Sequence, residues 1–178
     1  MRILLFVVVC LWVSACDSPS APAGASGPAA GYSVPEDSAI TQAVKNAYAC
    51  ISFRAGSRPA YDSIRDYFIP QAQLINFRED TSQVTSIDQF INFYRQFIEG
   101  NHIGMFAEEE IYGRSEQFGK IAHRISSYKT YLNSMDSLPE RGVNSFQLIK
   151  TPAGWKVSSI IWDVERPKQP IPAYYLKQ

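Results

Sequence analysis

Residues 141–167 read RGVNSFQLIKTPAGWKVSSIIWDVERP, and this stretch predicts a β-hairpin close to the C-terminus. Segments 143–151 and 155–165 are rich in β-branched and aromatic residues, which favour strands. Residues 152–154, Pro-Ala-Gly, are typical of a tight turn between them. Because side chains alternate across a strand, the second segment has two faces, and both are apolar toward the middle. A strand with two apolar faces is usually covered on both sides.

The residues before this hairpin divide into helical segments followed by strands. Apolar residues recur at helical spacing in three segments: residues 37–57, 58–70 and 86–100. Ser86 and Gln89 predict a capping box at the start of the third segment. Strand patterns occupy three more segments: residues 72–77, 102–118 and 120–132. Residues 108–110, Glu-Glu-Glu, are predicted to be a solvated strand edge. Helices followed by a long antiparallel meander predict an α+β fold.

Residues 1–15 have the features of a signal peptide. A basic Arg2 is followed by an apolar run that is too short to span a bilayer, and then by small residues. Residues 13–16, Val-Ser-Ala-Cys, resemble the bacterial lipobox, and this resemblance implies cleavage before Cys16 and lipidation of Cys16. Several acyl chains would hold the protein stably on a membrane. An ordinary signal peptide that is cleaved nearby is the alternative.

Residues 16–36 are predicted to be a flexible tether, because they consist largely of Ser, Pro, Ala and Gly. They lead into one domain, residues 37–168, and a C-terminal tail, residues 169–178. The predicted location is therefore the bacterial cell envelope, with the domain lipid-anchored and facing the periplasm or the exterior. The sequence does not decide between the inner and the outer membrane.

The composition argues against several classes of function. The chain has 17 basic and 17 acidic residues and no basic run, so a nucleic-acid partner is not expected. It has no nucleotide-binding loop, no zinc-ligand spacing and no G-x-S-x-G motif, so neither a cofactor nor a metal is predicted. Cys50 has no partner for an intramolecular disulfide, because the other cysteines belong to the N-terminal signal and anchor, and its place in an apolar helical pattern predicts a small buried hydrophobe rather than a reactive thiol. Any chemistry would be cofactor-free proton transfer.

Residues 141–167, together with FGKIAHRISSY at residues 118–128, resemble the nuclear transport factor 2-like superfamily, which includes the SnoaL-like proteins. The resemblance implies a cone-shaped roll, in which a curved antiparallel sheet wraps around three N-terminal helices and encloses a pocket. It also implies homodimers that pair sheet to sheet. The superfamily contains isomerases, dehydratases, cyclases, transport adaptors and binding domains, so the fold alone assigns no reaction.

In such a cone, one face of the last strand would line the interior. Interior positions are predicted for five residues: Trp155, Val157, Ser159, Ile161 and Asp163. This assignment places Asp163 near the mouth of the pocket. The predicted dimer face consists of three other residues: Ile160, Trp162 and Val164. Either a partner sheet or the chain's own tail would cover that face, and a β-bulge would exchange the two faces.

The predicted ligand-binding residues are polar or aromatic: Tyr48, Tyr94, Ser126, Tyr128, Arg141, Asn144, Trp155, Ser159 and Asp163. For these residues, a place in the core or in a structural hydrogen bond is the alternative. Three residues are candidates for proton transfer: Asp163, His123 and Tyr128. Asp163 could instead pair with Arg141 or Arg166. The strand pattern does not decide whether His123 or Arg124 points inward.

Three functions follow as hypotheses. The first is binding of a small, largely apolar molecule or a peptide segment in the pocket. The second is an isomerase, dehydratase or cyclase reaction that uses proton transfer in the pocket. The third is a dimeric interaction module without catalysis. An enzyme needs a titratable group buried in an open pocket, whereas a module would have its cone filled by side chains.

Overall fold

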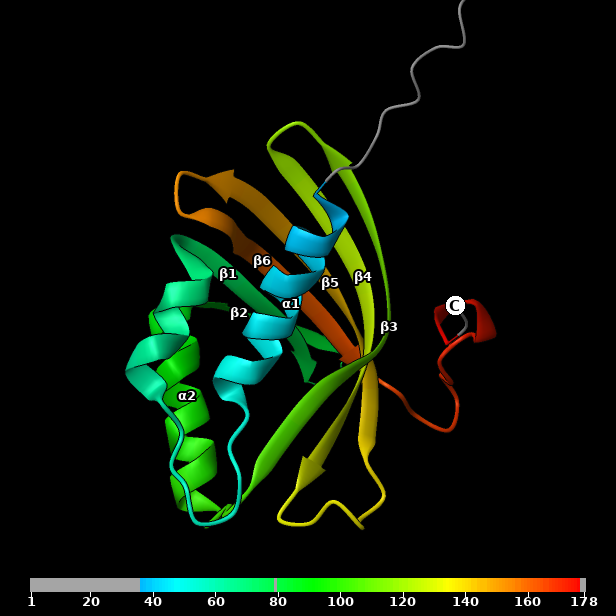
Figure 1. Cartoon of the computed structure of the whole chain (residues 1–178). Helices are drawn as coiled ribbons and strands as arrows, with labels where there is room; N and C mark the ends of the chain where they lie inside the picture. The colour runs from blue at the N-terminus through cyan, green and yellow to red at the C-terminus, as the bar shows by residue number, and fades with distance from the viewer. Residues whose placement is uncertain (1–35, 79, 177–178) are drawn as a thin grey trace, which may run out of the picture. The chain divides into compact units, whose positions relative to one another are not determined.

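The computed structural model describes residues 36–78 and 80–176 (Figure 1). The predicted signal peptide, the predicted lipidation site Cys16 and the predicted tether up to residue 35 lie outside the described residues. The elements follow in the order α1 (Asp37–Ile51), a 3-10 helix η1 (Tyr61–Tyr67), β1 (Phe68–Arg78), β2 (Thr81–Ser86), α2 (Ile87–Gly100), β3 (Phe106–Phe118), β4 (Ile121–Leu132), β5 (Glu140–Thr151), β6 (Gly154–Val164) and a second 3-10 helix η2 (Ala173–Tyr175).

The two α-helices agree with the sequence pattern. α1 buries one apolar face, which includes Ile40, Val44 and Tyr48. α2 begins with the predicted capping box, in which the Ser86 side chain accepts a hydrogen bond from the backbone N–H of Gln89. The Gln89 side chain accepts one in return from the backbone N–H of Ser86. Two N–H groups that no helical carbonyl can reach are thereby satisfied.

Both predicted helical segments before α2 are shorter than expected. α1 ends at Ile51 rather than near residue 57, because Phe53 exchanges backbone hydrogen bonds of 2.7 and 3.1 Å with Phe106 of β3. The segment 58–70 forms only the 3-10 helix η1, because Phe68 already begins β1 and pairs with β6. Strand β2, which the sequence pattern does not predict, pairs with β1 and leads directly into α2.

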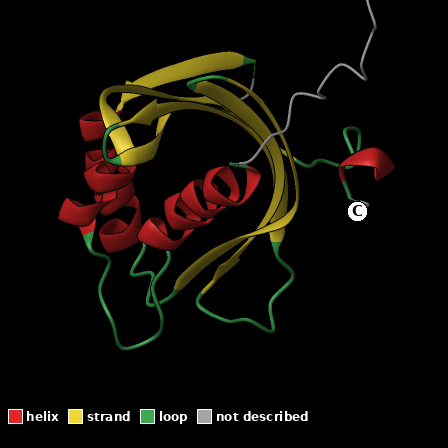
Figure 2. Cartoon of the chain, turned by 45° about the horizontal axis from the view of Figure 1, so that its top comes forward, coloured by secondary structure: helices red, strands yellow, loops and turns green. Residues whose placement is uncertain are grey.

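The six strands form one sheet in the order β2-β1-β6-β5-β4-β3. β1 and β6 are parallel, and the other neighbouring pairs are antiparallel. The sheet is curved, and α1 and α2 lie on its concave side (Figures 1 and 2). This arrangement confirms the predicted α+β fold with a curved sheet wrapped around N-terminal helices. The one parallel pair is a departure from the wholly antiparallel sheet that was expected.

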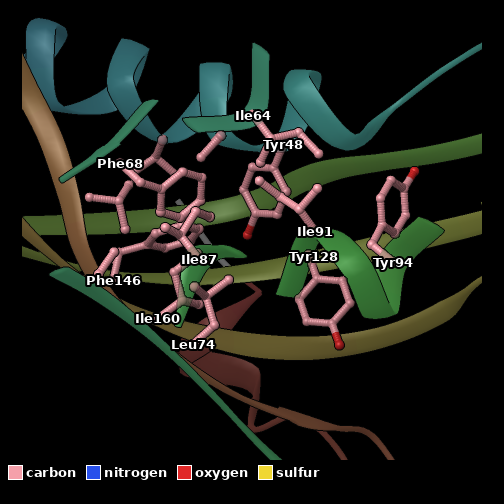
Figure 3. Packing of buried hydrophobic residues seen from close by; sticks show 14 of the residues in the cluster. Tyr48, Ile64, Phe68, Leu74, Ile87, Ile91, Tyr94, Tyr128, Phe146 and Ile160 are labelled. Atoms are coloured by element: carbon pink, nitrogen blue, oxygen red, sulfur yellow. The ribbon is translucent and has the colours of Figure 1, made fainter. Parts of the chain in front are cut away.

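The hydrophobic core lies between the concave face and the helices (Figure 3). Leu74, Ile91 and Phe146 come from a strand, a helix and another strand, and each is at most 2% exposed. Burying an apolar side chain of this size contributes about 1.5–3 kcal/mol to stability. Tyr48 and Tyr128 are also buried in this layer, so their hydroxyl groups need polar partners or an adjoining cavity.

A β-bulge in β6 decides which side chains face inward near the C-terminus. Gln147 of β5 pairs with Ser159, whereas the next residue, Leu148, pairs with Val157. Ser158 is therefore the extra residue of the bulge, and the alternation changes phase there. Before the bulge, Trp155 and Val157 are buried on the concave face, as predicted.

Beyond the bulge, the predicted assignment of faces is wrong. Ile160 is buried and Trp162 is partly buried, and both line a cavity on the concave side. Val164 lies on the same side of the strand as these two residues. Ser159, Ile161 and Asp163 are instead on the outer face, where Ile161 is 38% exposed. The predicted dimer face of Ile160, Trp162 and Val164 is therefore not an outer surface of the sheet.

The C-terminal tail contacts the outer face of the sheet. The Ser127 hydroxyl of β4 donates a hydrogen bond of 2.7 Å to the backbone carbonyl of Tyr175. The carboxylate of Glu165 accepts one of 2.9 Å from the backbone N–H of Ile171, which is 9% exposed. The chain's own tail thus covers part of the face that a partner sheet would otherwise meet.

Candidate functional site

A cavity of about 600 Å³ lies between the helices and the concave face of the sheet. Most of its lining is apolar. The aromatic lining residues come from both α-helices and from five strands: Tyr48, Phe68, Phe90, Tyr94, Phe97, Phe106, Tyr128, Phe146 and Trp162. Figure 3 shows Tyr48, Tyr94 and Tyr128 approaching from α1, α2 and the sheet. A volume of this size lies in the range of small-molecule sites.

Glu108 of β3 is a carboxylate in this mostly apolar lining. Its side chain and that of Phe106 lie on the concave side of the sheet, and both line the cavity. Glu109, the residue between Glu108 and Glu110, points outward, is exposed and forms an ion pair of 2.8 Å with Lys129. The prediction that residues 108–110 form a solvated edge is therefore correct for Glu109 and wrong for its two neighbours. The physical reason is that the curvature of β3 places its inner side over α1.

The surroundings of Glu108 hold its side chain and change its acidity. The Thr130 hydroxyl donates a hydrogen bond of 2.8 Å to Oε2 of Glu108. The Ser52 hydroxyl accepts a hydrogen bond of 3.0 Å from the backbone N–H of Glu108 and donates to its carbonyl at 3.3 Å. Burial raises the pKa of Glu108 to about 7, the Thr130 hydrogen bond opposes this rise, and the charge of Glu140 adds to it. Near neutral pH, Glu108 can therefore both donate and accept a proton.

The side chain of Glu110 points to the concave side of the sheet, as that of Glu108 does, but its environment is different. Arg124 donates to both of its carboxylate oxygens at 2.7 and 2.8 Å, and the two side chains are 7% and 10% exposed. Ser126 donates a third hydrogen bond of 2.7 Å to Glu110. The carboxylate is fully occupied by donors from its own chain. Glu110 is therefore part of a buried structural ion pair and not a free acid or base.

A directed chain of hydrogen bonds connects Glu110 to the cavity wall. Because the Ser126 hydroxyl donates to Glu110, it must accept the 2.7 Å hydrogen bond from the Tyr48 hydroxyl. The Tyr48 oxygen in turn accepts a hydrogen bond of 2.9 Å from the Asn144 amide. Of the predicted ligand-binding residues, Tyr48 and Asn144 line the cavity, whereas Ser126 is fully buried behind them. The hydroxyl proton of Tyr48 is already donated to Ser126, so Tyr48 cannot donate a hydrogen bond to a ligand.

Tyr128 and Tyr94 also line the cavity, as predicted, and they differ in what they can offer. The Tyr94 hydroxyl donates to the backbone carbonyl of Ile51. The Tyr128 hydroxyl forms no hydrogen bond with the other described residues. Burial raises the pKa of Tyr128, and the nearby charge of Glu108 raises it further, so the phenol stays protonated. Tyr128 is thus a free hydrogen-bond donor close to Glu108.

Besides Ser126, four more predicted ligand-binding residues do not line the cavity: Arg141, Trp155, Ser159 and Asp163. Arg141 pairs with Glu165 at 2.7 Å, and the indole of Trp155 donates to Glu36 at 2.9 Å. Burial alone would raise the pKa of Asp163, but hydrogen bonds from Arg166, at 2.9 Å, and Gln169 outweigh it and lower that pKa. Asp163 therefore forms the ion pair that was the alternative to a catalytic role, and the bulge at Ser158 explains why it faces outward.

His123 lies on the outer face of β4, opposite to the cavity. Its Nδ1 is 3.9 Å from a carboxylate oxygen of Glu116, and its side chain is 36% exposed. Its neighbour Arg124 points inward to Glu110 instead. The candidate proton-transfer residues His123 and Asp163 are therefore both separated from the cavity by the sheet, and Tyr128 alone of the three lines it.

Within residues 36–78 and 80–176, no group of three or more His, Cys, Asp or Glu side chains is arranged to hold a metal ion. No helix in that part of the chain is both long enough and apolar enough to cross a membrane.

Comparisons with known proteins identify the fold. The sequence matches no family model, and it matches no curated protein. Among solved structures, an NTF2-like protein of unknown function from Pseudomonas putida has a TM-score of 0.60 at 12% identity, covering 77% of this chain and 93% of that one. A protein from Nostoc punctiforme, described as having a cystatin-like fold and an unknown function, has a TM-score of 0.59 at 9% identity, covering 79% and 98%.

A candidate scytalone dehydratase from Novosphingobium aromaticivorans has a TM-score of 0.59 at 10% identity, covering 74% of this chain and 85% of that one. Identities this low show the fold and nothing more specific. The chain thus has the nuclear transport factor 2-like fold that its sequence resembles. This fold is consistent with a domain that binds a molecule in its pocket or with an isomerase-type domain.

Proposed function

We propose that the domain binds a small, largely apolar molecule in the cavity. The observation that carries this proposal is a cavity of about 600 Å³ lined by aromatic rings, with free polar groups at Glu108 and Tyr128. Protein interiors are usually close-packed and have few voids larger than a water molecule. A mostly apolar pocket with a few convergent polar groups is the usual form of a small-molecule site. An interaction module without a ligand would need no such space.

Glu108 favours a second candidate function, proton transfer. An efficient general acid or base has a pKa near the working pH, and burial brings the pKa of Glu108 to about 7. Tyr128 would donate a hydrogen bond to an oxygen of the substrate while Glu108 moves the proton. This candidate keeps the reaction class inferred from the sequence, an isomerase, dehydratase or cyclase, but replaces Asp163 and His123 with Glu108.

The proposed location is the bacterial cell envelope, with lipid on Cys16. The order of Arg2, apolar run, small residues and Cys16 supports this proposal. Homodimerisation also remains a prediction. Because Ile160 and Trp162 line the cavity, a sheet-to-sheet dimer would use the outer face instead, which carries Val143 and Ile161.

The binding proposal is tested by extracting small molecules from purified native protein and identifying them by mass spectrometry. Ala47 of α1 is buried and lines the cavity, so Ala47→Phe would fill part of it. Ala49 lies on the exposed side of the same helix, so Ala49→Phe is the matched control. We expect a compound that accompanies the wild type and the Ala49→Phe variant and is lost from folded Ala47→Phe protein. Equal recovery from all three proteins would contradict binding in the cavity.

A further inference from the structure

The charges in the cavity lining have one sign. Glu108 and Glu140 line the cavity, and among the described residues no Lys, Arg or His does so. Neither carboxylate forms an ion pair with the described part of the chain. The other glutamates of β3 differ in this respect, because Glu109 pairs with Lys129 and Glu110 pairs with Arg124. Glu108 therefore places an unpaired acidic charge in the cavity wall, the exposed Glu140 adds a second, and the described residues supply no counter-charge.

We propose that the ligand is a hydrophobic amine, whose ammonium group lies beside Glu108 and whose apolar body fills the aromatic part of the cavity. This inference rests on the proposed binding function and specifies the chemical class of the ligand. One oxygen of Glu108 accepts from Thr130, and the other accepts no hydrogen bond from the described residues. An ammonium group has three donors and no acceptor, which suits an unpaired carboxylate oxygen.

The rings near Glu108 favour a cation for a second, independent reason. Phe106 lies two residues before Glu108 on the same side of β3, and its ring centroid is 5.5 Å from that of Tyr94. Phe90 stacks on Tyr94 with centroids 6.1 Å apart. Tyr128 lies two pairs along the β3–β4 ladder from the pair of Glu108 and Thr130, on the same face of the sheet. The face of an aromatic ring attracts a desolvated cation and repels an anion, so these rings and the carboxylate select the same charge.

The titratable groups that face Glu108 add no positive charge. Glu140 faces it from β5, Tyr128 from β4, Tyr94 from α2, and Tyr48 and Cys50 from α1. Burial, together with the Glu140 charge, raises the pKa of Glu108 to about 7. An amine requires the ionised form of Glu108. Its affinity should therefore fall about tenfold per pH unit below pH 7, and by up to about 90-fold between pH 8 and pH 5.

The test uses three probes with one apolar body: 2-naphthylmethylamine, 2-naphthylmethanol and 2-naphthoate. Binding of each probe to the purified protein is measured by isothermal titration calorimetry near pH 8 and near pH 5. At the higher pH we expect the amine to bind at least about tenfold more tightly than the alcohol, and the naphthoate to bind most weakly. At the lower pH the advantage of the amine over the alcohol should disappear.

Two variants separate the charge of Glu108 from the shape of the cavity. Glu108→Gln should abolish the preference for the amine and its pH dependence while leaving the affinity for the alcohol within about threefold. Glu109→Gln, which changes the adjacent outward-facing residue, should behave as the wild type does. If the alcohol binds, if Ala47→Phe weakens that binding, and if the amine binds no more tightly than the alcohol, the inference is wrong and the proposed function stands. If Ala47→Phe weakens the binding of none of the three probes, both the inference and the proposed function are wrong.

Discussion

The raised pKa of Glu108 predicts that this residue makes the folded domain less stable as the pH rises. In the folded state burial brings the pKa of Glu108 to about 7, compared with 4.5 for the free group. Between these two values the folded state binds more protons than the unfolded state does. The free energy of unfolding must therefore decrease with rising pH. The contribution is fully present below about pH 4.5 and is lost as the pH passes through about 7.

The magnitude follows from the size of the shift. A difference of one pKa unit corresponds to about 1.4 kcal/mol, so a rise from 4.5 to about 7 corresponds to about 3.5 kcal/mol. Water inside the cavity would reduce this value, so about 3.5 kcal/mol is an upper bound. Carboxylates with lowered pKa values, such as Asp163 and Glu165, contribute in the opposite direction at lower pH. A comparison of two proteins that share those groups cancels their contribution.

The assay is urea unfolding of the wild type and of Glu108→Gln at several pH values from about 4.5 to about 8.5. Glutamine has nearly the same shape and carries no titratable proton. We expect the variant to gain stability relative to the wild type by up to about 3 kcal/mol over this range, with most of the change between pH 5.5 and pH 8. Glu109→Gln is the control and should show a flat difference. A flat difference for Glu108→Gln as well would refute the raised pKa and the role of Glu108 as a titrating group in the cavity.

Three further predictions concern the rest of the chain. Glu110→Gln leaves the buried Arg124 guanidinium without its charge partner, so urea unfolding should show a loss of about 3–5 kcal/mol, and a loss below about 1 kcal/mol would contradict the structural role of the pair. Asp163→Asn breaks an exposed ion pair on the outer face, so stability should change by less than about 1 kcal/mol and probe affinity should not change. Cys16→Ser should release the protein from membranes with an unchanged melting temperature of the domain, and continued pelleting of the variant with membranes in high salt would defeat the lipid-anchor prediction.

The order of helices and strands could be predicted because it depends on patterns within single segments. The period of the apolar residues predicts α1 and α2, and Ser86 and Gln89 predict the capping box. The Pro-Ala-Gly turn predicts the hairpin of β5 and β6. These signals are local, because each is contained within a single helix, cap or turn. The resemblance to the NTF2-like proteins then supplied the curvature of the sheet and the pocket, which no single segment contains.

The sequence of β6 does not predict which of its side chains point to the concave face of the sheet and which point outward. Both of its faces are apolar, so burial does not favour one register over the other. The bulge at Ser158 depends on the pairing with β5 and on the parallel pairing with β1, and both are contacts between distant segments. One inserted residue was enough to move Trp162 into the cavity and Asp163 out of it.

Glu108 was missed for a different reason. A run of three glutamates suggests that all three side chains are exposed to solvent, and β3 is an edge strand. The alternation of side chains still contained a signal, because Phe106, Glu108 and Glu110 share one face and Phe106 is buried. A strand whose apolar residue and acidic residues point to the same side must either expose the first or bury the others. That alternation identifies two inward glutamates, and on the neighbouring strand β4 one basic residue, Arg124, faces inward with them.

One buried arginine for two inward glutamates leaves one carboxylate without a partner, and the structure shows which one. Arg124 lies on β4 beyond Tyr128, so it reaches Glu110 and not Glu108. A buried ion pair stabilises a fold only weakly, but an unpaired buried carboxylate costs free energy unless it is protonated or meets a cation. Burial of Glu108 raises its pKa to about 7, which is the direction expected of an unpaired carboxylate. Such a cost is more readily retained where the carboxylate has a use, and the lining of aromatic rings around Glu108 indicates that its use lies in what the cavity binds.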